Sequence, residues 1–249
     1  DWGEFGLGWQ QLNTWARMVT PDTAVLIVQA TPWSPSTNGP VTGDVVHVNI
    51  QDEKDFDKYK GKLAGKVVLF GPMRDVPPVD KPLFERYTDK DLEDIAEYPV
   101  SERSGGLSPE MQARLHAYMQ RMKIIDEVAQ FFAEEKVAAV ILPSRDAKNG
   151  GGSGGTFFDD NGATLGRTPY LADKRVKIPV VVAAIESYGR LYRLTEAHAP
   201  CTVQIDVETK FTGDHEHGYY TIAEIPGTDS KLKDQVGMVG GHLDSWIAG

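Results

Sequence analysis

An imidazole and a carboxylate stand two residues apart near the end of the sequence, at His242 and Asp244, directly after two glycines. Neutral histidine is the commonest metal ligand in proteins, and a neighbouring carboxylate can hold its other ring nitrogen and fix the tautomer. The glycines let the backbone turn sharply after the apolar run at residues 236–240, at the edge where open α/β sheets place their sites. Because His-x-Asp is a common pattern, the spacing alone leaves two interpretations open, a metal site and a solvent-exposed loop.

Five further histidines fall outside this motif, and four of them invite comparison with metal ligands but receive no chemical role from the pattern. His215 and His217 have the chemistry of ligands, but no third ligand stands nearby, so we predict a polar hairpin loop at the surface. His116 and His198 lie in expected helices and are predicted to be ordinary surface or packing residues.

Two other stretches resemble ligand-binding motifs but lack a residue that each motif requires. Residues 150–155 are rich in glycine, but they lack the Lys-Ser/Thr ending of a phosphate loop and do not join a strand to a helix. A flexible loop is therefore predicted there. Residues 159–162 resemble part of a calcium loop without the glutamate at its last position, which indicates a turn.

Composition excludes several classes of protein. With 41% hydrophobic and 25% charged residues in a chain of 249, the sequence is typical of a folded protein with one large or two modest domains. No apolar stretch approaches the roughly 20 residues that span a bilayer. A net charge of -10 disfavours nucleic acids and anionic membranes as partners. The single cysteine, Cys201, excludes an intrachain disulfide framework and a cysteine-based zinc cluster.

Periodicity and turn residues predict an alternation of strands and helices. Residues 52–62 read as a short helix or turn, and residues 71–106 as an irregular insertion with one short helix at 89–97. A further helix is expected at residues 186–198. The expected strands are residues 9–19, 45–50, 65–70, 138–142, 178–184, 202–210, 219–225 and 236–240, the last two separated by a turn at 226–229.

A long helix is predicted to begin at Ser108. The serine can cap exposed amides, Pro109 suits the first helical position, and Glu110 complements the positive end of the helix dipole. Apolar residues then recur at spacings of three and four, so they share one face, which we expect to be core or interface. They are Met111, Leu115, Tyr118, Met122, Ile125, Ala129 and Phe132.

The motif at residues 240–246, Gly-Gly-His-Leu-Asp-Ser-Trp, together with residues 222–228 and 234–236, resembles the first metal-ligand segment of the zinc aminopeptidase and glutamate carboxypeptidase family. The resemblance implies two zinc ions, with His242 as a zinc ligand and Asp244 supporting the catalytic metal site. The family's other ligands and its Glu-Glu pair follow this segment, and none can be assigned here. The resemblance therefore implies that this chain by itself is inactive.

The middle of the chain resembles a protease-associated domain, which the long-chain branch of that family carries as an insertion. The resemblance rests on residues 45–48, 65–70, 137–142 and 178–182. It implies a β-rich α/β domain, an open barrel or sandwich with flanking helices, inserted between strands of an α/β exopeptidase domain. The implied boundaries are 1–24 for the first peptidase strands, 25–198 for the inserted domain with its insertion at 71–106, and 199–249 for the following peptidase strands.

The resemblances lead to one main functional hypothesis and two rivals. The main hypothesis is a metalloexopeptidase that is secreted or periplasmic, acts on peptides and can form a homodimer. Since the chain starts at Asp1 without a signal peptide and ends soon after a strand pattern, we expect truncation at both ends. One rival is a non-catalytic substrate- or protein-binding module of a receptor-like homologue. The other, a small-molecule-binding α/β protein, is weaker because no nucleotide fingerprint follows an early strand.

Overall fold

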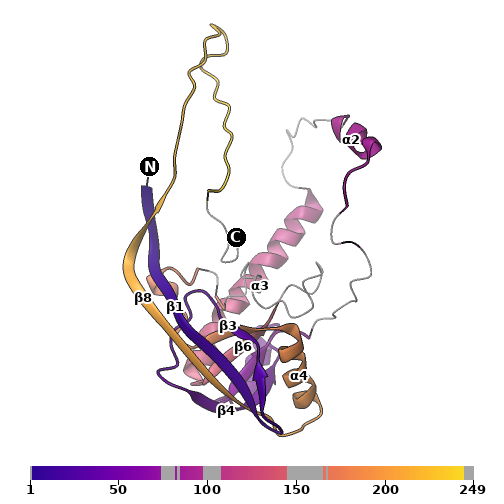
Figure 1. Ribbon diagram of the computed structural model, residues 1–249, viewed down its shortest axis with the longest axis vertical. Helices are drawn as coiled ribbons and strands as arrows, with labels where there is room; N and C mark the ends of the chain where they lie inside the picture. Colours follow the sequence, from indigo (N-terminus) through magenta and orange to yellow (C-terminus); the bar gives the residue numbers. More distant parts are fainter. Residues whose placement is uncertain are drawn as a thin grey trace.

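The computed structural model describes residues 2–73, 82, 85–97, 108–144, 165–166 and 168–243. Their centre is one mixed sheet in the order β2-β1-β8-β4-β5-β6-β7-β3 (Figure 1). The strands are β1 (Trp2–Thr20), β2 (Ala24–Leu26), β3 (Val28–Ala30), β4 (Val41–Val48), β5 (Val67–Phe70), β6 (Ala139–Pro143), β7 (Val180–Ala183) and β8 (Thr202–Tyr219). The helices are η1 (Glu53–Asp55), α1 (Phe56–Tyr59), α2 (Asp89–Ala96), α3 (Pro109–Glu134), η3 (Ala172–Lys174) and α4 (Ile185–Glu196).

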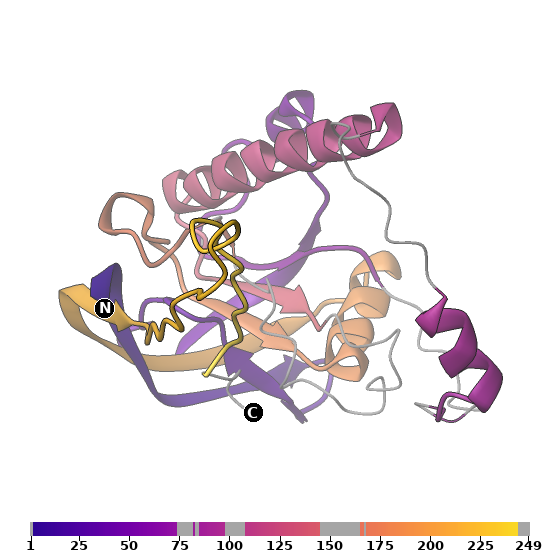
Figure 2. The same ribbon diagram turned by 90° about the horizontal axis from the view of Figure 1, so that it is seen from above.

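Strands β4 to β7 form the parallel centre of the sheet. Each residue of β6 and β7 is buried, and both strands read as continuous apolar runs, as expected where helices cover both faces of a sheet. Alternate side chains enter two separate cores. Leu69 and Ile141 pack with α4, whereas Val68 and Val140 pack with α3. Figure 2 shows the two helices on either side of the strands. The mixed α/β class that the sequence predicts is therefore confirmed.

Helix α3 begins where its sequence predicts. The hydroxyl of Ser108 accepts a hydrogen bond from the amide of Met111 at 3.2 Å, and Pro109 occupies the first turn. Val128 and Phe132 near its carboxyl end are fully buried against the sheet. The amino-terminal half extends beyond the sheet (Figure 1), so its predicted apolar face is not part of the core of the described residues.

Strand β1 pairs with β8, which lies almost 200 residues later in the sequence. It pairs antiparallel with β8 from Trp2↔Tyr219 to Thr20↔Thr202, with several irregularities in register. The inner part of this ribbon enters the core through Met18 and Ile205, and the outer part runs past the body (Figure 1). The predicted strand at residues 202–210 is therefore confirmed but is longer. Since β1 and β8 lie in the same sheet as β4 to β7, the domain boundaries at residues 24 and 199 stay a prediction.

The insertion at residues 71–106 contains the short helix that the sequence predicts. Helix α2 has a capping box in which Thr88 and Asp91 each accept a hydrogen bond from the other's backbone amide. The glycine-rich residues 150–155 and the acidic turn at 159–162 lie outside the described residues.

The two strands expected after β8 are wrong. Residues 221–229 and 236–242 have no regular secondary structure, and a turn that begins after Asp229 separates the two segments. Val239 is 100% exposed and Ile225 95% exposed. Both predictions rested on apolar content alone, but a strand also needs a neighbour that satisfies its amides and carbonyls. The described residues offer these two segments no such neighbour.

Candidate functional site

His242 does not lie in a strand-edge site in this structure. It is exposed in an irregular segment, and the following Leu243 is also exposed. Asp244, the carboxylate predicted to support it, lies outside the described residues. The assignment of both residues to a metal site therefore stays a prediction.

The described residues do not form a zinc site. A structural or catalytic zinc ion takes at least three protein ligands. Within the described part of the chain, no three side chains of histidine, cysteine, aspartate or glutamate come close enough to hold a metal ion. His242 can contribute one such ligand, so any complete site needs groups from elsewhere.

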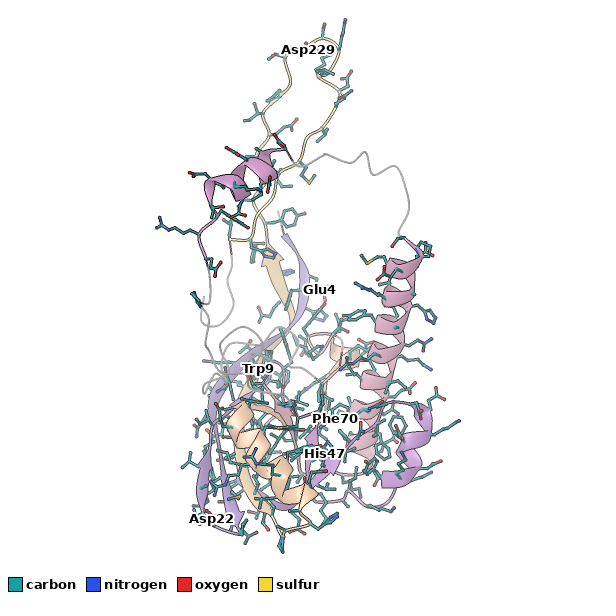
Figure 3. The ribbon with its side chains drawn as sticks, turned by 90° about the vertical axis from the view of Figure 1, so that its right-hand side faces the viewer. Glu4, Trp9, Asp22, His47, Phe70 and Asp229 are labelled. Atoms are coloured by element: carbon teal, nitrogen blue, oxygen red, sulfur yellow. The ribbon has the colours of Figure 1, made fainter. Side chains whose placement is uncertain are left out.

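His215 and His217 lie in strand β8 rather than in the predicted hairpin loop, and they are exposed as expected. The prediction of a loop was wrong because this polar stretch lacks the apolar residues typical of a strand, although it pairs with β1. His215 Nδ1 lies 2.5 Å from the Glu4 carboxylate on the neighbouring strand. Figure 3 places Glu4 on the ribbon, well above His47 in the body. This pair belongs to the ribbon surface and does not complete a site with His47.

The ion pair between His215 and Glu4 predicts a measurable titration. The hydrogen bond between His215 and Glu4 is the largest cause that raises the pKa of His215 above its ordinary value and lowers the pKa of Glu4. The attraction between their opposite charges acts in the same direction. The pair therefore favours the folded state while His215 is protonated and loses this effect as pH rises through the folded pKa. In an NMR titration we expect the pKa of His215 to exceed about 6.5. Glu4→Gln should return it towards that value, and an unchanged pKa in Glu4→Gln would refute the pairing.

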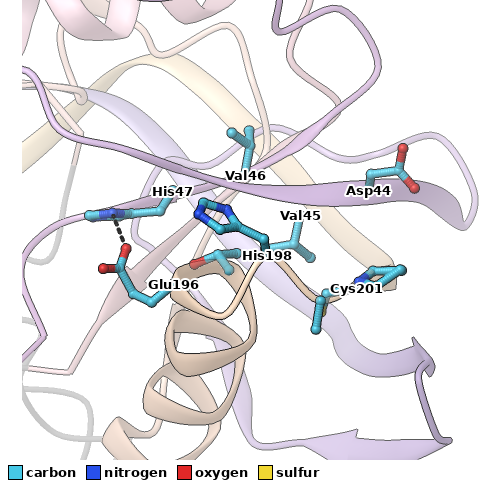
Figure 4. A pocket seen from close by; sticks show the side chains of 10 residues that line it. Asp44, Val45, Val46, His47, Glu196, His198 and Cys201 are labelled. Atoms are coloured by element: carbon cyan, nitrogen blue, oxygen red, sulfur yellow. Dashed lines mark ion pairs between the residues drawn. The ribbon is translucent and has the colours of Figure 1, made fainter.

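A groove of about 620 Å³ lies between β4 and the segment that follows α4. His47 and Asp44 enter it from β4, and Glu196 and His198 enter it from the end of α4 and the turn beyond (Figure 4). Helix α4 ends at Glu196, earlier than the predicted residue 198, and His198 takes a left-handed backbone conformation with φ 52°. That conformation is typical just past a helix end.

His47 is a partly buried titratable group that lines this groove. Its side chain is 19% exposed, and its ring meets Tyr192 edge-on at 4.8 Å between centroids. Burial lowers the pKa of His47, while the nearby Glu196 carboxylate and a backbone hydrogen bond with Gly71 oppose that shift. The 3.9 Å between Nδ1 and the Glu196 Oε1 is too long for a hydrogen bond. Burial is therefore the largest influence on the pKa of His47, which lies below its ordinary value.

The groove can bind a polar group, but it lacks an activated nucleophile. Cys201 is buried at its margin, and burial raises the pKa of its thiol to about 11, which keeps it protonated. Asp44 is held by Lys66 at 2.7 Å, and this contact lowers the pKa of the Asp44 carboxyl. The remaining groups are the imidazoles of His47 and His198 and the exposed carboxylate of Glu196, which suit hydrogen bonding rather than covalent chemistry.

Sequence reasoning did not single out this groove. His47 stands in an apolar strand and His198 in a predicted helix, so neither has a ligand-like spacing. They approach each other because the chain returns past β4 after α4. Pro200 indicates that the helix ends before it, but no local signal indicates which strand this turn faces.

No protein-family model matches this chain, and no curated protein sequence matches it. Among solved structures, the chain is similar to a peptidase M28 precursor from Shewanella amazonensis SB2B, with 13% identity and a TM-score of 0.48 over 87% of this chain and 39% of that one. It is also similar to an aminopeptidase from Aneurinibacillus sp. strain AM-1, with 14% identity and a TM-score of 0.47 over 87% of this chain and 36% of that one. The chain thus spans less than two fifths of either protein.

Among the described helices, none is both long and apolar enough to cross a membrane. The longest, α3, carries charged side chains along its length, including Arg114 and Lys123.

Proposed function

We propose that this chain is part of a zinc-dependent exopeptidase, in which His242 is a ligand of the first zinc ion and Asp244 supports the catalytic metal site. The observation that carries the proposal is the motif at residues 240–246, together with the segment at 222–228 that precedes it. In the family that these segments resemble, they supply the first metal ligand. The substrates would be peptides cleaved near one terminus.

The exposed apolar segment after β8 supports the proposal. Ile222, Ile225, Val236, Met238 and Val239 are all exposed in the structure. Soluble proteins rarely leave so many large apolar side chains uncovered in one stretch, so such a stretch indicates a surface that is normally covered. We infer that the rest of the exopeptidase to which we assign this chain covers these apolar side chains.

The chain by itself should lack activity, because a two-zinc site needs more ligands than His242 and Asp244. The parent protein, meaning the longer protein to which we assign this chain, would supply the missing acidic and histidine ligands and the general base. It would bind two zinc ions. We propose a secreted or periplasmic location for it, and a homodimer is compatible with the same family.

Residues 25–198 would be the protease-associated domain, with residues 71–106 inserted into it, and residues 1–24 and 199–249 would join it to the peptidase domain. The parallel strands β4 to β7 and helices α3 and α4 fall within this range. Most residues that line the groove between His47 and Glu196 also fall within this range, and Ala199, Pro200 and Cys201 follow it. A role in substrate capture is therefore compatible with the inserted domain.

The alternative is a non-catalytic module that binds a substrate or a protein in a receptor-like homologue. The groove favours it, since its groups suit binding and its cysteine is protonated. The retention of both His242 and Asp244 favours the enzyme. The parent reading frame separates the two: an aspartate soon after residue 249 and a later Glu-Glu pair indicate a peptidase, and their absence indicates a receptor-like protein.

Purified chain of 249 residues tests the claim of inactivity. We expect no zinc to remain after dialysis, and no release of amino acids from a mixture of short peptides. Stoichiometric zinc accompanied by peptide turnover would refute the division of the site between this chain and the rest of the parent.

A further inference from the structure

The amino-terminal half of α3 carries an apolar face that the structure leaves exposed. Met111 and Leu115 are each 49% exposed, Met119 is 50% exposed and Tyr118 is 57% exposed. At about 100° per residue these four side chains share one side of the helix. We call this set the α3 face. It lies on the part of α3 that extends beyond the sheet (Figure 3).

Basic side chains border the α3 face on both edges. The same helical geometry puts Arg114 and Arg121 along one edge and Lys123 near the other. Within residues 109–123 they outnumber the single acidic residue, Glu110. Arg114 pairs with Glu110, and Lys123 pairs with Glu127 and Glu53, but these are solvent-accessible pairs of the kind that contribute little. Because the whole chain has a net charge of -10, this basic border is a local exception. It favours an acidic partner for the α3 face.

Helix α2 has the complementary surface. Its apolar residues Leu92 and Ile95 are each 52% exposed and lie three residues apart, on one side of the helix. Among its other residues, only Lys90 is basic, and the acidic ones are Asp89, Asp91, Glu93 and Asp94. None of its residues is buried. An isolated helix of this length is marginal in water even with a good cap, so α2 gains most if a neighbour covers its apolar side.

We propose that the α3 face is the docking surface for α2 of the same chain, so that the two helices form an antiparallel pair. Ile95 would pack on Leu115 and Leu92 on Tyr118, as the antiparallel direction requires, and the acidic residues would lie along the basic border. In the structure α2 and α3 lie apart (Figures 1 and 2), with both apolar surfaces exposed.

Chain length permits this docking. Eleven residues, 97–107, separate the end of α2 from Ser108. Fully extended, they reach about 36 Å, whereas the α3 face from Met111 to Met119 is only about 12 Å long. A second copy of the α3 face is a poorer occupant, because self-pairing would bring the Arg114 and Arg121 edges of two chains to one seam, where like charges repel.

Cysteine cross-linking in the full chain tests the proposal. In the variant Ile95→Cys/Leu115→Cys, oxidation should give a disulfide within one chain, seen as a peptide pair by mass spectrometry and as a monomer on a non-reducing gel. The matched control is Ile95→Cys/Gln120→Cys, because Gln120 lies on the opposite, exposed side of α3. We expect at least about tenfold less cross-link in this control, by the helical geometry that separates the two faces. A disulfide only between two chains, equal yields in both variants, or no disulfide would overturn the proposal.

Hydrogen exchange provides a second readout that does not need new cysteines. If α2 docks, its amides should exchange at least about tenfold more slowly than in a free peptide of residues 85–97, which cannot hold a stable helix. Leu115→Asp should remove that protection while leaving the amides of β6 unchanged, because residue 115 is exposed and distant from the core. Unprotected α2 amides in the unmodified chain would contradict the docking.

Discussion

Phe132→Ala is expected to lower the free energy of unfolding by about 3–5 kcal/mol, the range typical of truncating a buried aromatic side chain. Phe132 is fully buried, and its ring meets Phe70 of β5 nearly perpendicularly at 5.5 Å between centroids. It therefore joins α3 to the parallel centre of the sheet. The alanine variant loses this contact and leaves a cavity. Urea denaturation, monitored by circular dichroism, measures the change in stability.

Tyr219→Ala is the matched control for this prediction. It also truncates an aromatic side chain, but Tyr219 is 79% exposed at the end of β8. We expect a change within about 0.5 kcal/mol, as for most surface substitutions. Equal losses of stability in the two variants would show that α3 does not pack on the sheet through Phe132.

His242→Ala in the parent protein is expected to lower kcat/KM for peptide hydrolysis by more than about 100-fold. Replacing groups that merely orient metal ligands already costs roughly 10–100-fold in metal affinity or activity, and removal of a ligand should cost more. Asp244→Asn should fall within that lower range, since we assign Asp244 to support of the site. Steady-state kinetics together with the zinc content of each variant measure both effects.

His217→Ala is the control, because it removes an exposed imidazole of β8 outside the proposed site. We expect kcat/KM and zinc content to match those of the unmodified parent. A His242→Ala variant that keeps full activity would remove His242 from the site, and a loss in His217→Ala of similar size would point to a general loss of fold.

Local signals predicted the elements whose structure depends on nearby residues. Ser108 and Pro109 mark the start of α3 because a hydroxyl cap and a proline act within one helical turn. The apolar runs of β5, β6 and β7 predict buried strands because parallel strands are covered on both faces. In each case a few neighbouring residues carry the information.

Long-range partners were not predictable from the sequence. The strand at β1 was expected, but its pairing with β8 joins Thr20 to Thr202 across almost the whole chain. The same limit explains the false strands at 219–225 and 236–240, since their apolar residues say nothing about a neighbour. Periodicity likewise predicted the apolar side of α3 but not its exposure at Leu115.

The candidate site was predictable only in part. The motif around His242 could be recognised from the sequence alone, because its glycines and its possible ligand residues stand next to one another. The groove at His47 could not be recognised from the sequence, because it forms where the turn at His198 packs beside β4. Residue types indicate possible chemistry, but tertiary packing decides which groups meet.

Zinc content and product analysis of the purified parent protein test the central claim most directly. The proposal predicts two zinc ions per chain and release of single amino acids from one end of a peptide. It also predicts loss of both properties after chelation and their return on addition of zinc. A parent that binds no zinc and leaves peptides intact, while binding them or another protein, would contradict the exopeptidase assignment and support the non-catalytic module.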